Sequence, residues 1–170
     1  MEMKSGLTRR SFIQGMGATA AVGIAASKVR GANEQIGIGV IGCGGRATSH
    51  MRLLQTMKEN DEPVNIAAVC DVYKPRLDKA VEFTKAKPYM LHEELLADPN
   101  VDVVLIATPD HWHGHQLIDA VRADKDVYCE KPLTHWSQLD LAKRCVAEVN
   151  KTERVVQVGT QGMSSSAWTQ

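Results

Sequence analysis

The chain has 170 residues, of which 44% are hydrophobic and 24% are charged, so it can form one domain with a core but is too short for two full domains. Its 20 basic and 20 acidic side chains cancel, and no excess of charge points to nucleic acid as a partner. Composition and charge are therefore those of an ordinary globular protein, and its function must be inferred from particular motifs.

The first 32 residues differ in composition from the rest of the chain. Two arginines, Arg9 and Arg10, precede a stretch of small, weakly apolar residues at 15–26. This segment resembles a twin-arginine (Tat) export signal, although Gln14 occupies a position where lysine is often found. The stretch is about 12 residues long, against the roughly 20 needed to cross a bilayer, so we expect no stable membrane anchor.

We therefore predict a signal peptide at residues 1–32 and a periplasmic or otherwise exported protein. A disordered basic arm or a short amphipathic helix stays open as an alternative, because Lys28 and Arg30 add positive charge. The sequence does not fix the cleavage site.

After residue 32, short β-branched runs alternate with longer stretches of helical period, which indicates a parallel sheet covered by helices. The predicted strands lie at Ile36–Ile41, Val64–Cys70, Pro88–Leu91, Val101–Ala107, Asp126–Cys129 and Arg154–Val158. The predicted helices lie at Ala47–Met57, Pro75–Lys85, His92–Ala97, Gly114–Ala123 and Ser137–Asn150. The fold class is therefore α/β, a doubly wound Rossmann sheet of about six strands over residues 33–162, followed by a polar tail or truncated linker at 163–170.

A glycine loop, G-x-G-x-x-A, directly follows the first predicted strand. Gly42 permits the tight turn, Gly44 lets a pyrophosphate approach the backbone, and Ala47 keeps the next helix close to the sheet. Gly45 and Arg46 lie at the helix start, where backbone amides bind phosphates. The motif predicts dinucleotide binding, and a tight strand-to-helix turn without a ligand is the alternative.

Asp71 ends the second predicted strand. An acidic side chain there accepts hydrogen bonds from the adenosine ribose hydroxyls and repels a 2′-phosphate, which favours NAD over NADP. Asp71 lies further along the chain than the usual spacing of about 20 residues. A solvated aspartate at a strand end is the alternative, and Arg46 and Arg76 leave NADP open.

Two polar segments follow later strands, at the carboxyl edge where open α/β sheets bind ligands. In the first, at 108–115, three histidines occupy alternate positions, His111, His113 and His115. One loop does not secure the converging ligands of a metal site, so we expect no metal but contact with a cofactor or substrate. A purely structural loop stays open.

The second segment contains Glu130-Lys131-Pro132. A lysine at this edge can exchange a proton with a substrate hydroxyl while hydride passes to a cofactor. An ordinary surface Lys-Pro turn is the alternative. The presence of the glycine loop in the same sheet favours the catalytic interpretation.

Four cysteines, Cys43, Cys70, Cys129 and Cys145, show neither C-x-x-C spacing nor the pattern of a disulfide framework. Most lie in the glycine loop or at the ends of predicted strands. We expect them to be small buried thiols.

These motifs together resemble the Gfo/Idh/MocA oxidoreductases over residues 35–162. The likeness rests on the glycine loop, on Ala-Thr-Pro-Asp-His-Trp-His at 107–113 and on Tyr-Cys-Glu-Lys-Pro-Leu at 128–133. The resemblance implies NAD(P)-dependent oxidation or reduction of a sugar, polyol or related hydroxy compound. It implies Lys131 as the catalytic lysine and His113 beside the nicotinamide or substrate. Cofactor contacts are implied at Thr108, Pro109 and Glu130.

The resemblance also implies a C-terminal α/β substrate domain, which these 170 residues do not contain. We therefore expect this chain alone to bind NAD without turning over a sugar, and a homo-oligomer only if that domain exists. An exported NAD-dependent glycosidase of the same fold is an alternative, but it commonly lacks the Glu-Lys-Pro lysine. A noncatalytic nucleotide-binding module is the other alternative.

Overall fold

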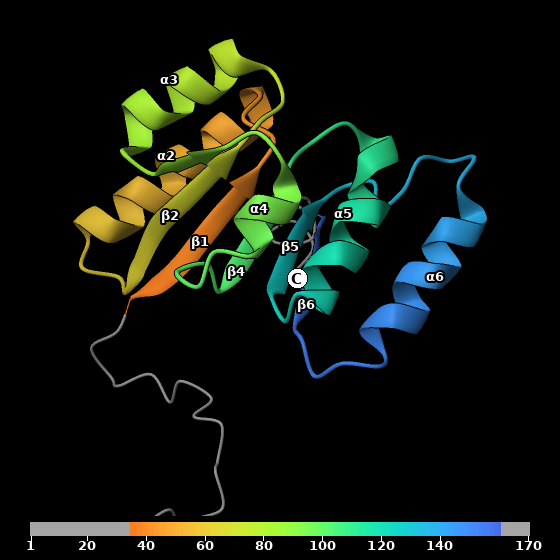
Figure 1. Cartoon of the computed structure of the whole chain (residues 1–170). Helices are drawn as coiled ribbons and strands as arrows, with labels where there is room; N and C mark the ends of the chain where they lie inside the picture. Colours follow the sequence, from red (N-terminus) through yellow and green to blue (C-terminus); the bar gives the residue numbers. More distant parts are fainter. Residues whose placement is uncertain (1–34, 161–170) are drawn as a thin grey trace, which may run out of the picture. The chain divides into compact units, whose positions relative to one another are not determined.

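The structure is a computed structural model that describes residues 35–160, so the predicted signal at 1–32 and the tail at 163–170 lie outside the described residues (Figure 1). Within this range one sheet contains β1 (Ile36–Ile41), β2 (Val64–Cys70), β3 (Lys87–Tyr89), β4 (Val103–Ile106), β5 (Asp126–Glu130) and β6 (Val156–Gly159). The strand order is β3-β2-β1-β4-β5-β6, and every neighbouring pair is parallel. The predicted doubly wound Rossmann sheet is confirmed.

Helices cover both faces of the sheet. They are α2 (Gly45–Glu59), α3 (Lys74–Thr84), α4 (His92–Leu96), α5 (Asp110–Arg122) and α6 (Leu139–Val149). The buried side chains of α2 and α3 pack with one face of the sheet, and those of α4, α5 and α6 pack with the other. Figure 1 shows α6 beside α5, on the side of α5 that is away from β4.

The central strand β1 is apolar because helices pack on both of its faces. Val40 and Ile41 are almost completely buried. Gly39 lies between them and Ile38, and a Cβ built on it would stand 2.7 Å from Leu95 of α4. The missing side chain therefore allows α4 to approach the sheet, and the sheet holds the β1 end, where the glycine loop starts, in a rigid frame.

Several element bounds differ from the predicted ones. Helix α5 begins at Asp110 and not at Gly114, because Pro109 has a φ of −59° and supplies the residue before the helix. Helix α2 begins at Gly45, two residues before the predicted start. The predicted start is late because glycine is a poor helix former, so the sequence pattern assigns Gly45 to the loop. Helix α6 and strands β3, β4 and β6 differ from prediction by one or two residues at their ends.

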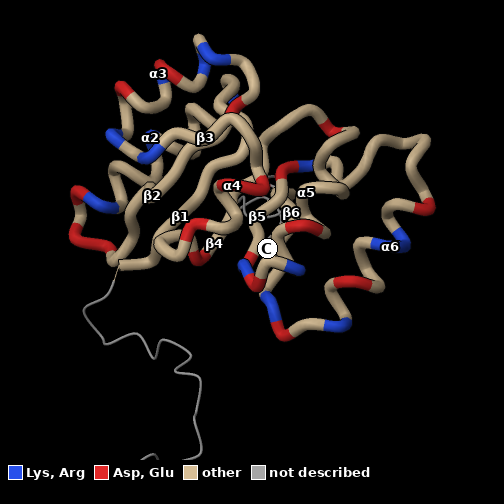
Figure 2. Tube along the Cα trace, in the orientation of Figure 1, with Lys and Arg blue, Asp and Glu red and all other residues tan. Residues whose placement is uncertain are grey.

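Acidic and basic residues are interspersed along the helices rather than collected in one segment (Figure 2). This arrangement agrees with the balanced charge of the sequence. Among the helices of residues 35–160, none has both the length and the apolar character needed to cross a membrane.

Candidate cofactor site

The loop from β1 to α2 turns at Gly42, whose φ of 84° lies in the left-handed region. The Gly42 amide donates to the Cys70 carbonyl at 2.8 Å, which fixes the loop against the end of β2. A Cβ built on Gly42 would stand 2.9 Å from the carbonyl carbon of Ala107. The backbone angle and the neighbouring strand therefore both require glycine at this position.

Gly44 and Gly45 differ from Gly42 because a Cβ built on either meets no heavy atom within 4 Å. Packing within the described residues does not explain these two glycines. Helix α2 also has no side-chain cap at Gly44, so the amides of its first turn are available to an anion. Ala47 is fully buried against the sheet, as the motif predicts. The loop therefore fits the pyrophosphate of a dinucleotide.

Asp71 follows β2 and is 8% exposed. Its Oδ2 accepts the Cys43 amide and its Oδ1 accepts the Tyr73 amide, each at 2.8 Å. The carboxylate thus ties the glycine loop to the end of β2. A carboxylate can accept about four hydrogen bonds, so Asp71 can also accept hydrogen bonds from ribose hydroxyls. Arg76 lies over the ring of Tyr73, 5.7 Å from its centroid.

The segment at 108–115 is helical from Asp110 onward, so the expected histidine loop is wrong for most of its length. Helical geometry separates the three histidines: His113 is buried, whereas the His111 side chain is 56% exposed. Within residues 35–160, no group of three or more His, Cys, Asp or Glu side chains could hold a metal ion.

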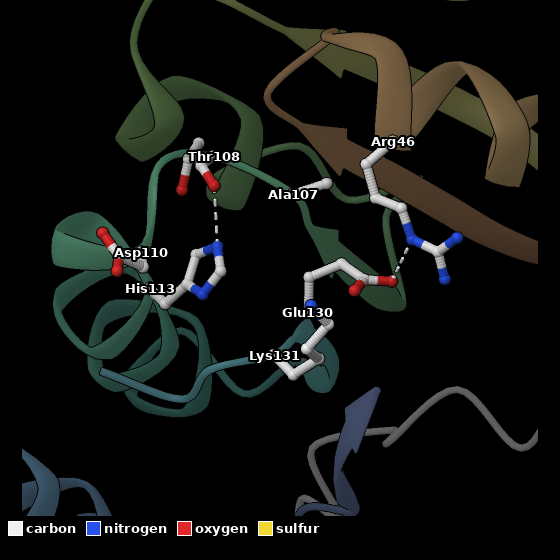
Figure 3. Close-up of a pocket in the computed structure, with 7 residues that line it drawn as sticks. All are labelled: Arg46, Ala107, Thr108, Asp110, His113, Glu130 and Lys131. Carbon is white, nitrogen blue, oxygen red and sulfur yellow. Dashed lines mark hydrogen bonds and ion pairs between the residues drawn. The ribbon is translucent and has the colours of Figure 1, made fainter. Parts of the chain in front are cut away.

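His113 connects two loops of the site, as Figure 3 shows for one of its contacts. Its Nε2 lies 2.7 Å from the Thr108 carbonyl oxygen, and its Nδ1 lies 2.7 Å from the Pro132 carbonyl oxygen. A catalytic role for His113 stays a prediction, and this geometry favours a positioning role. The Thr108 hydroxyl is also engaged, and it donates to Gln116 at 2.7 Å.

Glu130 ends β5, and its side chain is only 5% exposed. Two side chains of helix α2 contact its Oε1: Arg46 Nε donates at 2.8 Å, and His50 Nε2 lies at 2.6 Å. Sequence reasoning missed His50. Its spacing of four residues from Arg46 puts both on one helix face, which was the only available signal.

Lys131 follows Glu130, is exposed, and forms a cis peptide bond with Pro132. It lines a pocket of about 370 Å³ that the carboxyl ends of β4 and β5 share with the start of α2. Figure 3 shows the residues that line it, which are Arg46, Ala107, Thr108, Asp110, His113, Glu130 and Lys131. Pro109, the residue before α5, is not among the residues that line this pocket. Predicted residues from three separate motifs therefore meet in one pocket.

All four cysteines are buried and free. Burial raises the pKa of Cys43, Cys70 and Cys129 to about 12. Their thiols stay neutral near pH 7 and are poor nucleophiles. The prediction of buried thiols is confirmed.

The curated relatives that match this chain include an inositol dehydrogenase and a glycosidase. Inositol 2-dehydrogenase of Rubrobacter xylanophilus is 32% identical over 132 residues, which cover 77% of this chain and 37% of the relative. The α-N-acetylgalactosaminidase of Shewanella oneidensis is 30% identical over 138 residues, which cover 72% of this chain and 28% of the relative. The chain therefore spans about a third of the length of the relatives it matches.

Solved structures agree with the fold. Myo-inositol dehydrogenase of Lactobacillus casei, in complex with NAD(H) and myo-inositol, superposes with a TM-score of 0.69 at 29% identity, covering 78% of this chain and 38% of that one. A probable dehydrogenase of Thermotoga maritima gives a TM-score of 0.69 at 31% identity, with 77% and 38% covered.

Residues 36–160 match the family described as "Oxidoreductase family, NAD-binding Rossmann fold". The match spans the glycine loop, Asp71 and the Glu-Lys-Pro motif, so the predictions of family and of NAD as cofactor are both confirmed. The chain belongs to the Gfo/Idh/MocA family of oxidoreductases and contains its NAD-binding domain.

Proposed function

We propose that this chain is the cofactor-binding part of an oxidoreductase that transfers hydride between NAD and a sugar, polyol or related hydroxy compound. The observation that carries the proposal is the shared pocket. Three features lie along one edge of the sheet: the exposed Lys131, the Glu130 carboxylate held by Arg46 and His50, and the glycine loop. The substrate class is supported by the inositol dehydrogenases among the relatives.

NAD, when bound, supplies the hydride acceptor. The chain's own residues hold it and move a proton. The first-turn amides of α2 would hold the pyrophosphate, and Asp71 would accept hydrogen bonds from the adenosine ribose hydroxyls. The Nζ of Lys131 exchanges a proton with the substrate hydroxyl. His113 holds the Thr108 and Pro132 backbones in place, which keeps the lysine turn beside the end of β4.

Asp71 supports NAD over NADP. A 2′-phosphate would approach a carboxylate that is already fixed by two backbone amides and cannot turn away without losing them. Arg46 is one of the two arginines that could bind the 2′-phosphate of NADP, but its Nε donates to Glu130. We expect the dissociation constant for NADPH to exceed that for NADH by about tenfold or more, and Asp71→Ser to narrow this difference.

The proposal is tested by NADH titration of the 170-residue chain, followed by its fluorescence, and by turnover of the native gene product with a panel of polyols and sugars. Lys131→Ala should abolish turnover and leave the dissociation constant for NADH within about twofold. Lys151→Ala, in the turn that follows helix α6 and outside the pocket, is the matched control and should change neither.

Three results would contradict the proposal. Absence of saturable NADH binding would remove the cofactor role. Equal loss of turnover and of NADH binding in Lys131→Ala would make the lysine structural, and binding with no turnover on any substrate would favour the noncatalytic nucleotide-binding module.

The exported glycosidase is the second candidate, because the Shewanella relative is an α-N-acetylgalactosaminidase. Lys131 is the feature that separates the two, since the glycosidase branch commonly lacks this lysine. Release of p-nitrophenol from p-nitrophenyl α-N-acetylgalactosaminide by the native gene product would favour the glycosidase. Substrate-dependent formation of NADH would favour the dehydrogenase.

We also propose export through the Tat pathway, on the strength of Arg9 and Arg10 and the stretch at 15–26. The test is cell fractionation of the source organism expressing the tagged chain. Substitution of both arginines by lysine should retain the protein in the cytoplasm. Equal distribution of the two versions would overturn the proposal.

A further inference from the structure

Helix α2 and strand β5 meet through one buried carboxylate. Glu130 Oε1 lies 2.8 Å from Arg46 Nε and 2.6 Å from His50 Nε2, which are 84 and 80 positions away in sequence. Two contacts from one helix face to one oxygen fix the rotamer of the glutamate. Figure 3 shows the Arg46 contact at the wall of the pocket.

We call Glu130 with its two partners, Arg46 and His50, the Glu130 clamp. Packing around His50 holds this clamp in place. The His50 side chain is 13% exposed, and its ring lies edge-on to Tyr128 with centroids 5.4 Å apart. Arg46 is partly exposed and lines the pocket, so its charge is screened more than that of Glu130. The pocket therefore has a carboxylate in a fixed place in its wall.

The strand order assigns this carboxylate to one half of a bound dinucleotide, an argument that rests on the proposed function. Asp71 follows β2, on one side of β1, and Glu130 is the last residue of β5, on the other side. With the pyrophosphate at α2 between them and the adenosine at Asp71, the nicotinamide half extends toward Thr108 and Glu130.

We propose that Glu130 sets the preference of the site between oxidised and reduced cofactor, and that His50 is the positioning residue that holds its carboxylate. The oxidised nicotinamide ring carries a positive charge that the reduced ring lacks. A fixed carboxylate nearby stabilises the oxidised form selectively, and Arg46 opposes this effect. The other ionisable groups of the pocket wall are Asp110, His113 and Lys131.

The experiment measures dissociation constants for NAD⁺ and NADH with the 170-residue chain at one pH. Glu130→Gln keeps the shape and an acceptor oxygen but removes the charge, and should raise the ratio of the NAD⁺ to the NADH constant about tenfold. Arg46→Gln should move the ratio in the opposite direction. A partly unfolded variant weakens both forms equally, so the ratio is insensitive to lost stability.

Two variants isolate the positioning role of His50. His50→Ala releases the carboxylate and should shift the ratio in the direction of Glu130→Gln, by about threefold. His50→Gln retains a side-chain donor and should restore the ratio to that of the unmodified chain. A histidine needed only for folding would change both constants together and leave the ratio constant.

Glu148→Gln is the matched control. Glu148 on α6 accepts Arg122 Nε at 2.9 Å and Lys151 Nζ at 2.7 Å, which reproduces a two-donor clamp outside the pocket. Its removal should leave the ratio unchanged. A ratio altered less than twofold by Glu130→Gln, or altered equally by the control, would overturn the inference while NAD binding stands. A chain that binds neither form would overturn both.

Discussion

The two halves of the binding edge are built in different ways. At the ends of β1 and β2, glycines and backbone amides shape the site, with Asp71 as their acceptor. At the ends of β4 and β5, side chains that are distant in sequence shape it, through His113 and the Glu130 clamp. The first half, which we call the local half, is shaped mainly by short loop segments. The second, which we call the tertiary half, depends on contacts between residues that are distant in sequence.

This difference explains which substitutions each half tolerates. A local turn depends on backbone angles, so its failures are steric and are confined to a few residues. A side-chain network depends on satisfied buried polar groups, so the loss of one member leaves its partners without donors.

Gly42→Val should have the largest effect, a loss of about 4 kcal/mol in the free energy of unfolding. A branched side chain cannot adopt the φ of 84° without strain, and its Cβ would press against Ala107. Urea denaturation followed by circular dichroism measures the loss. A decrease below about 1 kcal/mol would show that the turn relaxes and is not rigid.

His113→Leu should destabilise the fold by about 3 kcal/mol, because the carbonyls of Thr108 and Pro132 lose their donor in a buried place. The same urea titration measures it. His111→Leu, on an exposed position of the same helix, is the control and should cost less than about 0.5 kcal/mol. Similar losses for the two variants would mean that the β4–β5 half does not depend on its buried network.

Gly44→Val should weaken NADH binding about a hundredfold, which is about 2.7 kcal/mol. A Cβ at this position meets no heavy atom within 4 Å, and the valine side chain would enter the space that we assign to the pyrophosphate. Isothermal titration calorimetry measures the affinity, and the free energy of unfolding should change by less than about 1 kcal/mol. Unchanged affinity would remove the glycine loop from the site.

Asp98 lies in the turn before β4, away from both halves of the binding edge. Its substitution should cause the smallest of these changes in free energy. Burial alone would raise the pKa of its carboxyl. Hydrogen bonds from the Asn100 amide, the Tyr89 hydroxyl and the Lys87 ammonium outweigh burial and lower the pKa from 3.8 to about 2. A depressed pKa stabilises the fold above about pH 4, and this stabilisation is lost as the pH falls through 2.

Asp98→Asn should therefore be less stable than the unmodified chain by roughly 2 kcal/mol between pH 4 and 7, with the gap closing toward pH 2. Unfolding curves at a series of pH values measure the gap. The pKa of Glu148 is also lowered to about 2, so only the difference between the two proteins reports on Asp98. A gap that is constant with pH would contradict the account.

The local half could be predicted from sequence because its signals lie close together. Strands β1 and β2 have the predicted bounds, and the glycines and Asp71 have the expected places. Their patterns, apolar runs followed by glycine or aspartate, are set by neighbours in the chain.

The tertiary half could be predicted only in part. Thr108, Glu130 and Lys131 were placed at the right edge, because parallel strands end on one side of a sheet. The helical start at Asp110 was missed, since histidine and tryptophan near a proline are typical of loops. His50 was missed because its partner lies 80 positions away and no local pattern marks the pair.

A crystal structure of the 170-residue chain grown with NAD tests the central claim most directly. The account predicts the pyrophosphate on the first-turn amides of α2, the adenosine ribose on Asp71 and the nicotinamide between Thr108 and Glu130. NAD bound at another surface, or crystals that contain no NAD at saturating concentration, would contradict it.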